Sequence, residues 1–260
     1  MPENAAFARR FGGVARLYGQ AALERFQTAH VCVVGIGGVG SWAVEALARS
    51  AIGHLTLIDL DMVAESNVNR QLHALSGDFG KAKISAMAER IAAINPRCKV
   101  TLVEDFVSPE NLGAMLGAPF DYLIDAIDQV RTKAAMIAWC QQRQIPLMTT
   151  GAAGGQIDPS RIEVADLART IQDPLLSKVR SLLRKEYGFT RDTQKKFGVP
   201  AVFSSEPLRY PESAAACAVP QRLEGLNCAG FGSSVCVTAT FGFFAAGEAL
   251  RHLATEKSPE

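Results

Sequence analysis

Short apolar runs alternate with longer amphipathic stretches along the first 150 residues of the chain. Apolar runs bounded by turn residues are typical of buried strands in a parallel sheet, and apolar residues three or four apart are typical of helices. The pattern predicts strands at 31–34, 53–59, 100–103, 120–128 and 146–150, and helices at 41–49, 83–94, after Pro109 and at 130–143. This alternation predicts an α/β fold: a Rossmann-like, mostly parallel, doubly wound sheet.

The remaining residues are less regular. Strands at 161–165 and 199–203 are expected to extend the sheet with antiparallel pairing. Asp173-Pro174 provides a helix start, with leucines at 175, 176, 182 and 183 on one face and Gly188 at the end. Residues 204–232 contain three prolines and predict a long mobile loop, which in a compact domain is usually functional.

Residues 225–247 carry no charge, and this stretch is long enough to span a bilayer, which takes ~20 residues. Polar residues and glycines dilute the stretch and no basic cluster flanks it, so we interpret 233–253 as a buried helix against the sheet or across a dimer interface. Membrane association is the less favoured alternative. The tail, 254–260, is expected to be disordered.

Length and composition predict one domain over 1–260: a nucleotide-binding core at about 29–150, an elaboration at about 151–232, and the C-terminal helix. The formal net charge of +1 excludes a uniformly basic, nucleic-acid-coating protein. The first ten residues lack the apolar core of a signal peptide, and the six cysteines follow no regular spacing. These features predict a cytoplasmic protein.

A glycine-rich loop follows the first predicted strand. Gly35 would permit a tight turn, Gly37 and Gly38 would admit a polyphosphate to the backbone amides, and Gly40 would let the next helix pack closely. The motif predicts nucleotide binding, with either ATP or a nicotinamide cofactor.

The polar segment after the second strand favours ATP. Asp59 ends that strand, where an acid commonly binds ribose hydroxyls. Amides and cations then follow that would surround a triphosphate, chemistry that hydride transfer does not need. The candidate nucleotide-binding residues here are Asp59, Asp61, Asn67, Asn69, Arg70, Gln71 and Lys83.

Two aspartates are expected near the carboxyl end of the fourth strand. For Asp128 the favoured interpretation is a Mg²⁺ ligand near the phosphates, and for Asp125 it is a cap for the helix at 130–143. A second glycine-rich turn, 151–159, would approach a substrate closely or form a bulge before the next strand.

Basic residues are concentrated in one later segment and in the N-terminal lead-in. In the lead-in, Arg10 and Arg16 either reach a phosphate or lie on the surface, and Arg16 is the candidate for the nucleotide site. The later segment is the candidate contact for a nucleic-acid backbone, although a solvated face is the alternative. It contains Lys178, Arg180, Arg184, Lys185, Arg191, Lys195 and Lys196.

Five motifs in order resemble the ubiquitin-activating-enzyme-like adenylating superfamily. They are the glycines at 35–40, Asp59-x-Asp61-x-Val63, 66–71 with Lys83, Ile94-Asn-Pro96 and Asp125-x-x-Asp128. The resemblance implies ATP and Mg²⁺ as cofactors, Asp59 as ribose ligand, and Asn69, Arg70 and Lys83 as phosphate contacts. It also implies that Asp128 is the Mg²⁺-linked catalytic carboxylate, acting with Arg70 and Lys83. Gln129 stands where this family often has Asn.

The chain departs from the sulfur-carrier branches of that superfamily. It has no Cys-x-x-Cys pair, so no structural zinc is expected, and Cys217 and Cys228 lack a neighbouring histidine and do not resemble a thioester nucleophile. The segments 10–19, 149–159 and 170–174 instead resemble a branch that dehydrates threonylcarbamoyladenosine in tRNA.

That resemblance implies an ATP-dependent cyclisation on tRNA carrying threonylcarbamoyladenosine. It also implies a homodimer, and a protein of a cysteine desulfurase system is a candidate associate in this branch. Two alternatives stay open: an adenylyltransferase that activates the C-terminus of a small sulfur-carrier protein, and a nicotinamide-dependent oxidoreductase.

Overall fold

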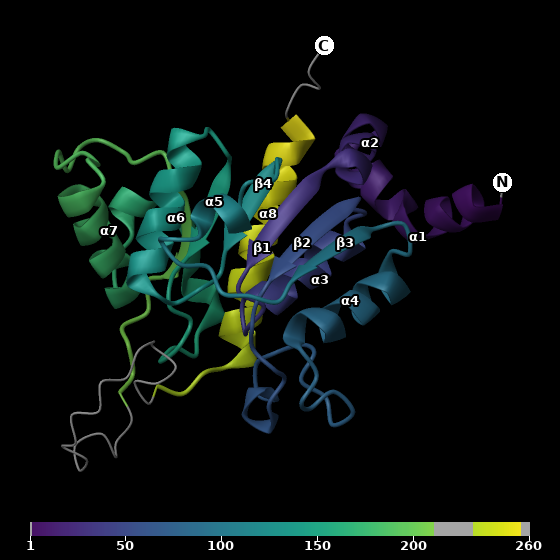
Figure 1. Ribbon diagram of the computed structural model, residues 1–260, viewed down its shortest axis with the longest axis horizontal. Coiled ribbons are helices and arrows are strands. Elements are labelled where there is room, and N and C mark those ends of the chain that lie inside the picture. Colours follow the sequence, from purple (N-terminus) through teal and green to yellow (C-terminus); the bar gives the residue numbers. More distant parts are fainter. Residues whose placement is uncertain (1, 211–230, 256–260) are drawn as a thin grey trace.

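A seven-stranded sheet forms the centre of the protein, with strand order β3-β2-β1-β4-β5-β7-β6 (Figure 1). The structure, a computed structural model, describes residues 2–210 and 231–255. Neighbouring strands are parallel except for β6 and β7, which are antiparallel. The strands are β1 (His30–Val34), β2 (His54–Ile58), β3 (Lys99–Val103), β4 (Tyr122–Asp125), β5 (Leu147–Thr150), β6 (Ile162–Asp166) and β7 (Pro200–Ser204). The predicted α/β fold class is confirmed.

Helices cover both faces of this sheet, in two layers (Figure 1). One face carries α2 (Gln20–Thr28), α3 (Gly40–Arg49), α4 (Lys83–Ile94) and α8 (Val235–Thr255), and the other carries α5 (Leu112–Met115), α6 (Val130–Gln142) and α7 (Pro174–Glu186). Successive residues of β1 alternate between the layers: Val31 and Val33 pack in the first, Cys32 and Val34 in the second. Both faces of β1 are therefore buried, which explains why its sequence is a continuous apolar run instead of an alternating one.

Helix α8 crosses α3 at close range. A Cβ on Gly242 would lie 2.5 Å from the carbonyl oxygen of Val39, so only glycine fits at this crossing. The helix lies two residues later than predicted and is buried against α3 and the sheet. Its residues Val235, Phe243 and Phe244 are partly exposed, and the Phe243 ring packs edge-on against Trp42 of α3. Within the described residues, no helix is both long and apolar enough to cross a membrane.

The N-terminal lead-in forms two helices. Helix α1 (Pro2–Tyr18) continues through Gly12 and Gly13, and the chain turns only at Gly19, where φ is +91°. Arg10 donates from Nη1 to the carbonyl oxygens of Ala93 (2.8 Å) and Ile94 (2.7 Å) at the end of α4. A cation is favourable at a helix C-terminus, so Arg10 fastens α1 to the domain.

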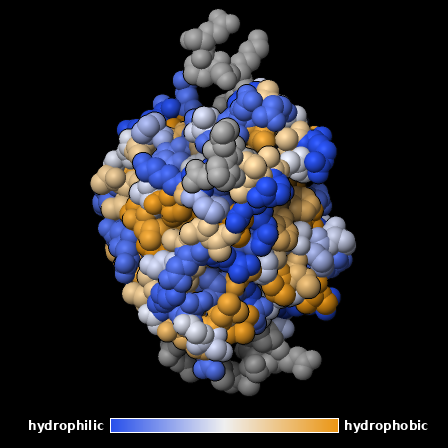
Figure 2. Space-filling view, turned by 90° about the vertical axis from the view of Figure 1, so that its right-hand side faces the viewer, coloured by the Kyte–Doolittle hydropathy of each residue, from blue (hydrophilic) through white to orange (hydrophobic). Residues whose placement is uncertain are grey.

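The face that α1, α2 and α4 form has hydrophobic side chains in separate patches between hydrophilic ones (Figure 2). Leu17, at the end of α1, is 79% exposed. Such scattered exposure is ordinary for a globular surface.

Several local predictions are confirmed in the C-terminal part. Asp173 caps α7 by accepting a hydrogen bond from the amide of Leu176 at 2.9 Å, and Gly188 follows the helix with φ of +72°. Most of the predicted loop, 211–230 with Cys217 and Cys228, lies outside the described residues, as does the tail from 256 onward.

Two stacked histidines lie at the amino-terminal end of the sheet. The rings of His30 and His54 are 3.5 Å apart between centroids, and their Nε2 atoms lie 2.8 and 2.9 Å from the hydroxyls of Thr56 and Thr101. Burial lowers the pKa of both rings; that of His54 falls to about 4, and the neighbouring His30 contributes to the decrease. Both imidazoles are therefore neutral in the folded protein at pH 7.

We expect this pair to make the fold sensitive to acid. In the unfolded chain a histidine takes up a proton below pH ~6.5, whereas the folded rings stay neutral to lower pH. The free energy of unfolding is therefore highest above pH ~6.5 and decreases as the pH falls from 6.5 towards 4. His54→Gln should flatten the dependence of the melting temperature on pH in this window. Equal slopes in the variant and the wild type would show that the pair is not the cause.

Candidate nucleotide-binding site

A cavity of about 600 Å³ opens where β1, β2, β4 and β5 end. The carboxyl ends of parallel strands meet at one edge of a sheet, which is where open α/β sheets bind ligands. Ten of the predicted site residues line it together, although they come from separate parts of the chain: Gly35, Gly37, Gly38, Asp59, Asp61, Asn67, Arg70, Gln71, Lys83 and Asp128.

The glycine loop has the geometry that the motif predicts. Gly35 has φ of +88°, and a Cβ there would lie 2.9 Å from the carbonyl oxygen of Ala126. Gly40 does not line the cavity; it begins α3, and its Cβ would lie 1.8 Å from the carbonyl oxygen of Gly35. The N-cap of α3 is Val39, which has no side-chain acceptor. The amide of Ser41 donates to the carbonyl oxygen of Gly37 at 3.1 Å, and no side chain caps this turn, whose helix N-terminus favours an anion.

Asp59 fastens the glycine loop to the end of β2. Its Oδ2 accepts a hydrogen bond from the amide of Ile36 at 2.6 Å, and its Oδ1 accepts one from the amide of Asp61 at 2.8 Å. Burial raises the pKa of this carboxyl, and the nearby Lys83 counteracts the rise. A carboxylate oxygen has a second lone pair, so these bonds leave acceptor capacity for ribose hydroxyls.

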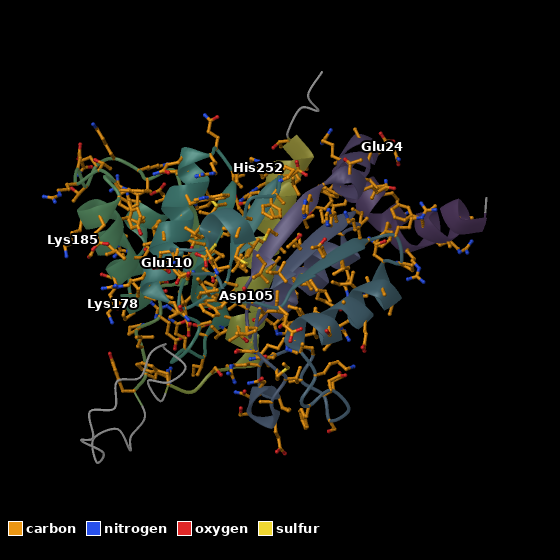
Figure 3. The ribbon with its side chains drawn as sticks, viewed as in Figure 1. Glu24, Asp105, Glu110, Lys178, Lys185 and His252 are labelled. Carbon is orange, nitrogen blue, oxygen red and sulfur yellow. The ribbon has the colours of Figure 1, made fainter. Side chains whose placement is uncertain are left out.

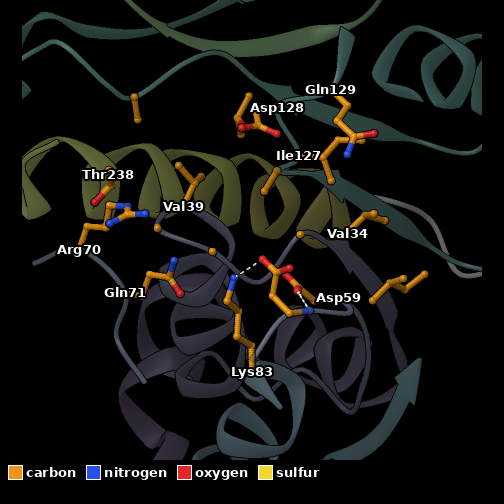
Figure 4. Close-up of a pocket in the computed structure, with 18 of the residues that line it drawn as sticks. Val34, Val39, Asp59, Arg70, Gln71, Lys83, Ile127, Asp128, Gln129 and Thr238 are labelled. Atoms are coloured by element: carbon orange, nitrogen blue, oxygen red, sulfur yellow. Dashed lines mark hydrogen bonds and ion pairs between the residues drawn. The ribbon is translucent and has the colours of Figure 1, made fainter. Parts of the chain in front are cut away.

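Lys83 is a nearly buried cation in the cavity wall. Its side chain is 7% exposed, and its Nζ lies 2.6 Å from Oδ2 of Asp61, whose own side chain is 73% exposed (Figure 4). The buried member of this ion pair is fixed at the start of α4, and the exposed member is free to move into solvent. A phosphate can therefore replace Asp61 as the partner of Lys83 without moving the lysine.

Arg70 is held beside the glycine loop by its neighbours. Its Nη1 donates to the carbonyl oxygen of Ser66 and to Oδ1 of Asn69, both at 3.0 Å, and its own carbonyl accepts from the indole of Trp42. Asn69 itself does not line the cavity, and its Nδ2 donates to the carbonyl oxygen of Ser233 at 3.1 Å. In this structure Asn69 therefore holds Arg70 beside the glycine loop, and its direct contact with a phosphate stays a prediction.

Gln71 is also directed into the site. It is 7% exposed, and its Oε1 has no hydrogen-bond partner among residues 2–210 and 231–255. An unpaired buried amide oxygen is costly, so a ligand donor is a natural partner for it.

Asp128 lies on the loop after β4, on the side of the cavity opposite Lys83 (Figure 4). The interpretation of Asp125 as a helix cap is wrong. The N-cap of α6 is Gln129, and Asp125 is fully buried, with one oxygen 2.8 Å from Nζ of Lys133 and accepting from the Thr149 hydroxyl at 2.7 Å. Burial raises its pKa, with Lys133 opposing. This buried pair fixes the strand end from which the Asp128 loop departs.

Arg16 is not part of the cavity in this chain. It is exposed on α1, where its guanidinium lies near the backbone of Gly12 and Gly13. The structure therefore does not bring it to the other predicted nucleotide-binding residues.

The basic residues of 178–196 lie on and after α7, away from the cavity. Lys178 and Lys185 point outward from this helix (Figure 3). Arg180 donates to the Thr170 hydroxyl, and Arg184 donates to the carbonyl oxygen of Thr190 and lies over the Phe197 ring. These two arginines are thus partly used in local packing, whereas Lys178, Lys185, Arg191, Lys195 and Lys196 are exposed.

Some cavity residues were missed from the sequence. Asp105 and Phe106 follow β3, and their position after a predicted strand could have indicated them. Ser233 precedes α8 and Thr238 lies in its first turn, and only the folded chain shows that this segment reaches the cavity.

Comparison with known proteins identifies the family. The sequence profile of the ThiF family matches residues 12–260, nearly the whole chain. The chain belongs to the ThiF family.

Individual members of the family resemble this chain over almost its full length. The tRNA threonylcarbamoyladenosine dehydratases of Escherichia coli and Haemophilus influenzae are 55% and 52% identical, over 95% and 97% of this chain and 94% and 96% of those proteins. A crystal structure of the E. coli enzyme in complex with ATP superposes with a TM-score of 0.86, at 53% identity and 95% coverage of both chains, and another contains AMP. The molybdopterin-synthase adenylyltransferase of E. coli is 33% identical over only 50% of this chain.

Two glycine variants separate folding from nucleotide binding. At Gly37 the nearest atom to an added Cβ is Nε2 of Gln71 at 4.0 Å, so Gly37→Ala should keep the wild-type melting temperature. Its methyl group would obstruct a phosphate, and we expect ATP affinity to fall about tenfold from loss of one charged hydrogen bond. Gly40→Ala should instead lower the melting temperature without ligand, because its Cβ would overlap the carbonyl of Gly35.

Thermal melts and calorimetric titration with ATP measure both effects. Wild-type ATP affinity in Gly37→Ala would contradict a phosphate at this loop.

Proposed function

We propose that this ThiF-family protein is an ATP-dependent dehydratase of threonylcarbamoyladenosine in tRNA. The observation that carries the proposal is the cavity, where Lys83, Arg70 and Asp128 surround the glycine loop. The two cations suit the oxygens of a triphosphate, and the carboxylate suits its metal ion. Full-length similarity to enzymes named for that reaction, one of them in complex with ATP, supports the substrate.

The reaction proceeds in two steps in this proposal. The threonyl carboxylate attacks the α-phosphorus of ATP, and pyrophosphate leaves. Lys83 and Arg70 stabilise the negative charge on the phosphoryl oxygens, an effect worth ~2.7 to 4 kcal/mol for one donor in a comparable site. The substrate's own carbamoyl group then attacks the acyl carbon, AMP leaves with one former carboxylate oxygen, and a ring closes. The nucleophile belongs to the substrate, so no enzyme cysteine is needed.

Mg²⁺ fits this site as a companion of ATP. It is commonly held by one or two carboxylates together with phosphate oxygens and water. Asp128 is the carboxylate that would hold it, and the ion would neutralise phosphate charge. Among residues 2–210 and 231–255 no group of three or more His, Cys, Asp or Glu is placed to hold a metal by itself, so the phosphates would complete the ligand set.

The decisive experiment supplies ATP, Mg²⁺ and tRNA carrying threonylcarbamoyladenosine. After digestion to nucleosides, the proposal expects the modified nucleoside to have lost the mass of one water, with AMP and pyrophosphate as co-products. Unchanged nucleoside mass would contradict it.

Replacement of Asp128 should uncouple binding from chemistry. Asp128→Asn keeps the size of the side chain and removes its charge, so we expect ATP to bind while pyrophosphate release falls at least a hundredfold, as for other single electrostatic contacts at a reacting centre. Calorimetric titration and a pyrophosphate assay measure the two quantities. Normal turnover in this variant would show that another group holds the catalytic charge.

The carrier-protein adenylyltransferase remains the alternative, supported by half-chain similarity to a molybdopterin-synthase adenylyltransferase. It would show ATP–pyrophosphate exchange that depends on a small carrier protein. Exchange that depends on modified tRNA instead would favour the dehydratase.

The exposed basic residues of α7 and the following loop form the proposed contact with tRNA phosphates. Replacing Lys178, Lys185, Lys195 and Lys196 together with Gln should weaken tRNA binding, and reduce the slope of log affinity against log salt by up to ~0.7 to 0.9 for each lost contact. ATP binding should be unchanged. These lysines are exposed, so the variant should fold, and filter binding at several salt concentrations measures the slope. Unchanged affinity would remove this surface from the proposal.

We also propose that the protein acts as a cytoplasmic homodimer. The partly exposed Phe243 and Phe244 of α8 support a partner surface. Arg16 makes no hydrogen bond or ion pair within the described residues, so it is available to a phosphate in a second copy of the chain. A monomer by analytical ultracentrifugation at micromolar concentration would contradict this.

A further inference from the structure

Two arms of the chain meet beside the cavity, one before and one after residues 211–230. The first arm, 205–210, follows β7. In it, Oε2 of Glu206 accepts hydrogen bonds from the amides of Ile157 (3.0 Å) and Asp158 (2.8 Å). The second arm, 231–234, leads into α8. Because β7 is parallel to β5, the first arm emerges at the edge of the sheet where the cavity lies.

Gly155 joins the two arms. Its amide donates to the carbonyl oxygen of Gly232 at 2.8 Å, and its carbonyl accepts from the amide of Arg209 at 2.8 Å. Its φ is +74°, and a Cβ there would lie 3.0 Å from Cδ1 of Phe231. Only glycine lets both arms approach so closely. The preceding residue, Gly154, lines the nucleotide cavity, so the junction is continuous with the cavity wall.

This junction creates an aromatic pair, Tyr210 and Phe231. Their ring centroids are 5.2 Å apart with planes inclined by 55°, so each ring supports the other. Tyr210 is nevertheless 71% exposed. An aromatic ring held in place by a neighbour and open to solvent provides a surface for stacking.

Tyr210 also forms one wall of a groove of about 450 Å³ against α7. Its lining includes the polar side chains of Gln172, Ser177 and Arg180, together with Pro174, Pro207 and Leu208. Arg180 is held by its bond to the Thr170 hydroxyl, and Gln172 is held at φ of +53°. The groove therefore combines a stacking surface with donors and acceptors for the edge of a ring.

The groove lies between the cavity and the basic residues of α7. Asp173 belongs to the groove, and its Oδ2 accepts a hydrogen bond at 2.9 Å from the amide of Ala152, which lines the cavity. On the outer side, Lys178 and Lys185 extend from the same helix. A base of a nucleic acid in the groove would thus have its phosphate backbone near these lysines. The nucleoside next to that base would lie near the bound nucleotide.

We propose that this groove binds an unpaired nucleobase of the tRNA substrate, stacked on Tyr210, next to the nucleoside whose carboxylate enters the cavity. The inference rests on the proposed function. Proteins read single-stranded RNA loops by stacking splayed bases on aromatic side chains and by hydrogen bonds to base edges. An apolar peptide is a poorer occupant, because Gln172, Ser177 and Arg180 line the groove and the adjoining surface is basic.

The test compares two RNA probes, an anticodon stem-loop carrying threonylcarbamoyladenosine and the same stem as a blunt duplex. Tyr210→Ala should bind the stem-loop about tenfold more weakly, as expected for loss of one stacked base, while its duplex and ATP affinities stay unchanged. Tyr210→Phe keeps the ring and should keep the affinity. Tyr18→Ala is the matched control, because that ring is 38% exposed and packs edge-on against Phe26 at the far end of the molecule.

A fluorescence experiment reports stacking directly. Stacking of a base on the indole of Tyr210→Trp should quench its fluorescence with the stem-loop and not with the duplex. Wild-type stem-loop affinity in Tyr210→Ala, or absence of this quenching, would overturn the site. Dehydration by the wild-type protein is measured in parallel. Its absence contradicts the proposed function, whereas normal dehydration with unaffected binding in Tyr210→Ala contradicts only the nucleobase site.

Discussion

The close approach between the turn after β1 and the start of α3 is the constraint on which the site depends. At Gly40 the helix backbone lies so near the carbonyl of Gly35 that any side chain would overlap it. This contact places the N-terminal end of α3 beside the cavity, where Gly38 and Val39 line the wall. Gly242 sets a similar contact on the other side of α3, where α8 crosses. The N-terminal end of α3 is therefore held between the sheet and α8.

Charges are arranged around this frame in two ways. The Asp125 and Lys133 side chains are both buried, and their ion pair holds the end of β4 in place. Removing one member of such a pair leaves an uncompensated buried charge, which typically costs ~3 to 5 kcal/mol. The pair of Lys83 and Asp61 instead combines a buried cation with an exposed carboxylate. That asymmetry would let the proposed phosphate ligand replace Asp61 as the partner of Lys83.

Much of the fold could be predicted because parallel strands covered on both faces have continuous apolar sequences. Strand and helix boundaries agree within a few residues, and the glycine loop has the predicted turn at Gly35. The site was less predictable where roles depend on partners. Asp125 and Asp128 are both aspartates after apolar residues, and no sequence pattern shows that Thr149 and Lys133 enclose one of them. Asn69 likewise lies near the predicted phosphate contacts, but its amide is hydrogen-bonded to Arg70 and to the backbone of Ser233.

The sequence by itself determined the order of strands and helices, the glycine loop and the residue types around a nucleotide, because these depend on local periodicity and on short motifs. Only the tertiary structure decided which side chains face the cavity and which are used in packing, because that depends on contacts between segments far apart in the chain. It brought the start of α8 to the nucleotide cavity, engaged Arg10 at the end of α4, and placed Tyr210 and Phe231 together at Gly155.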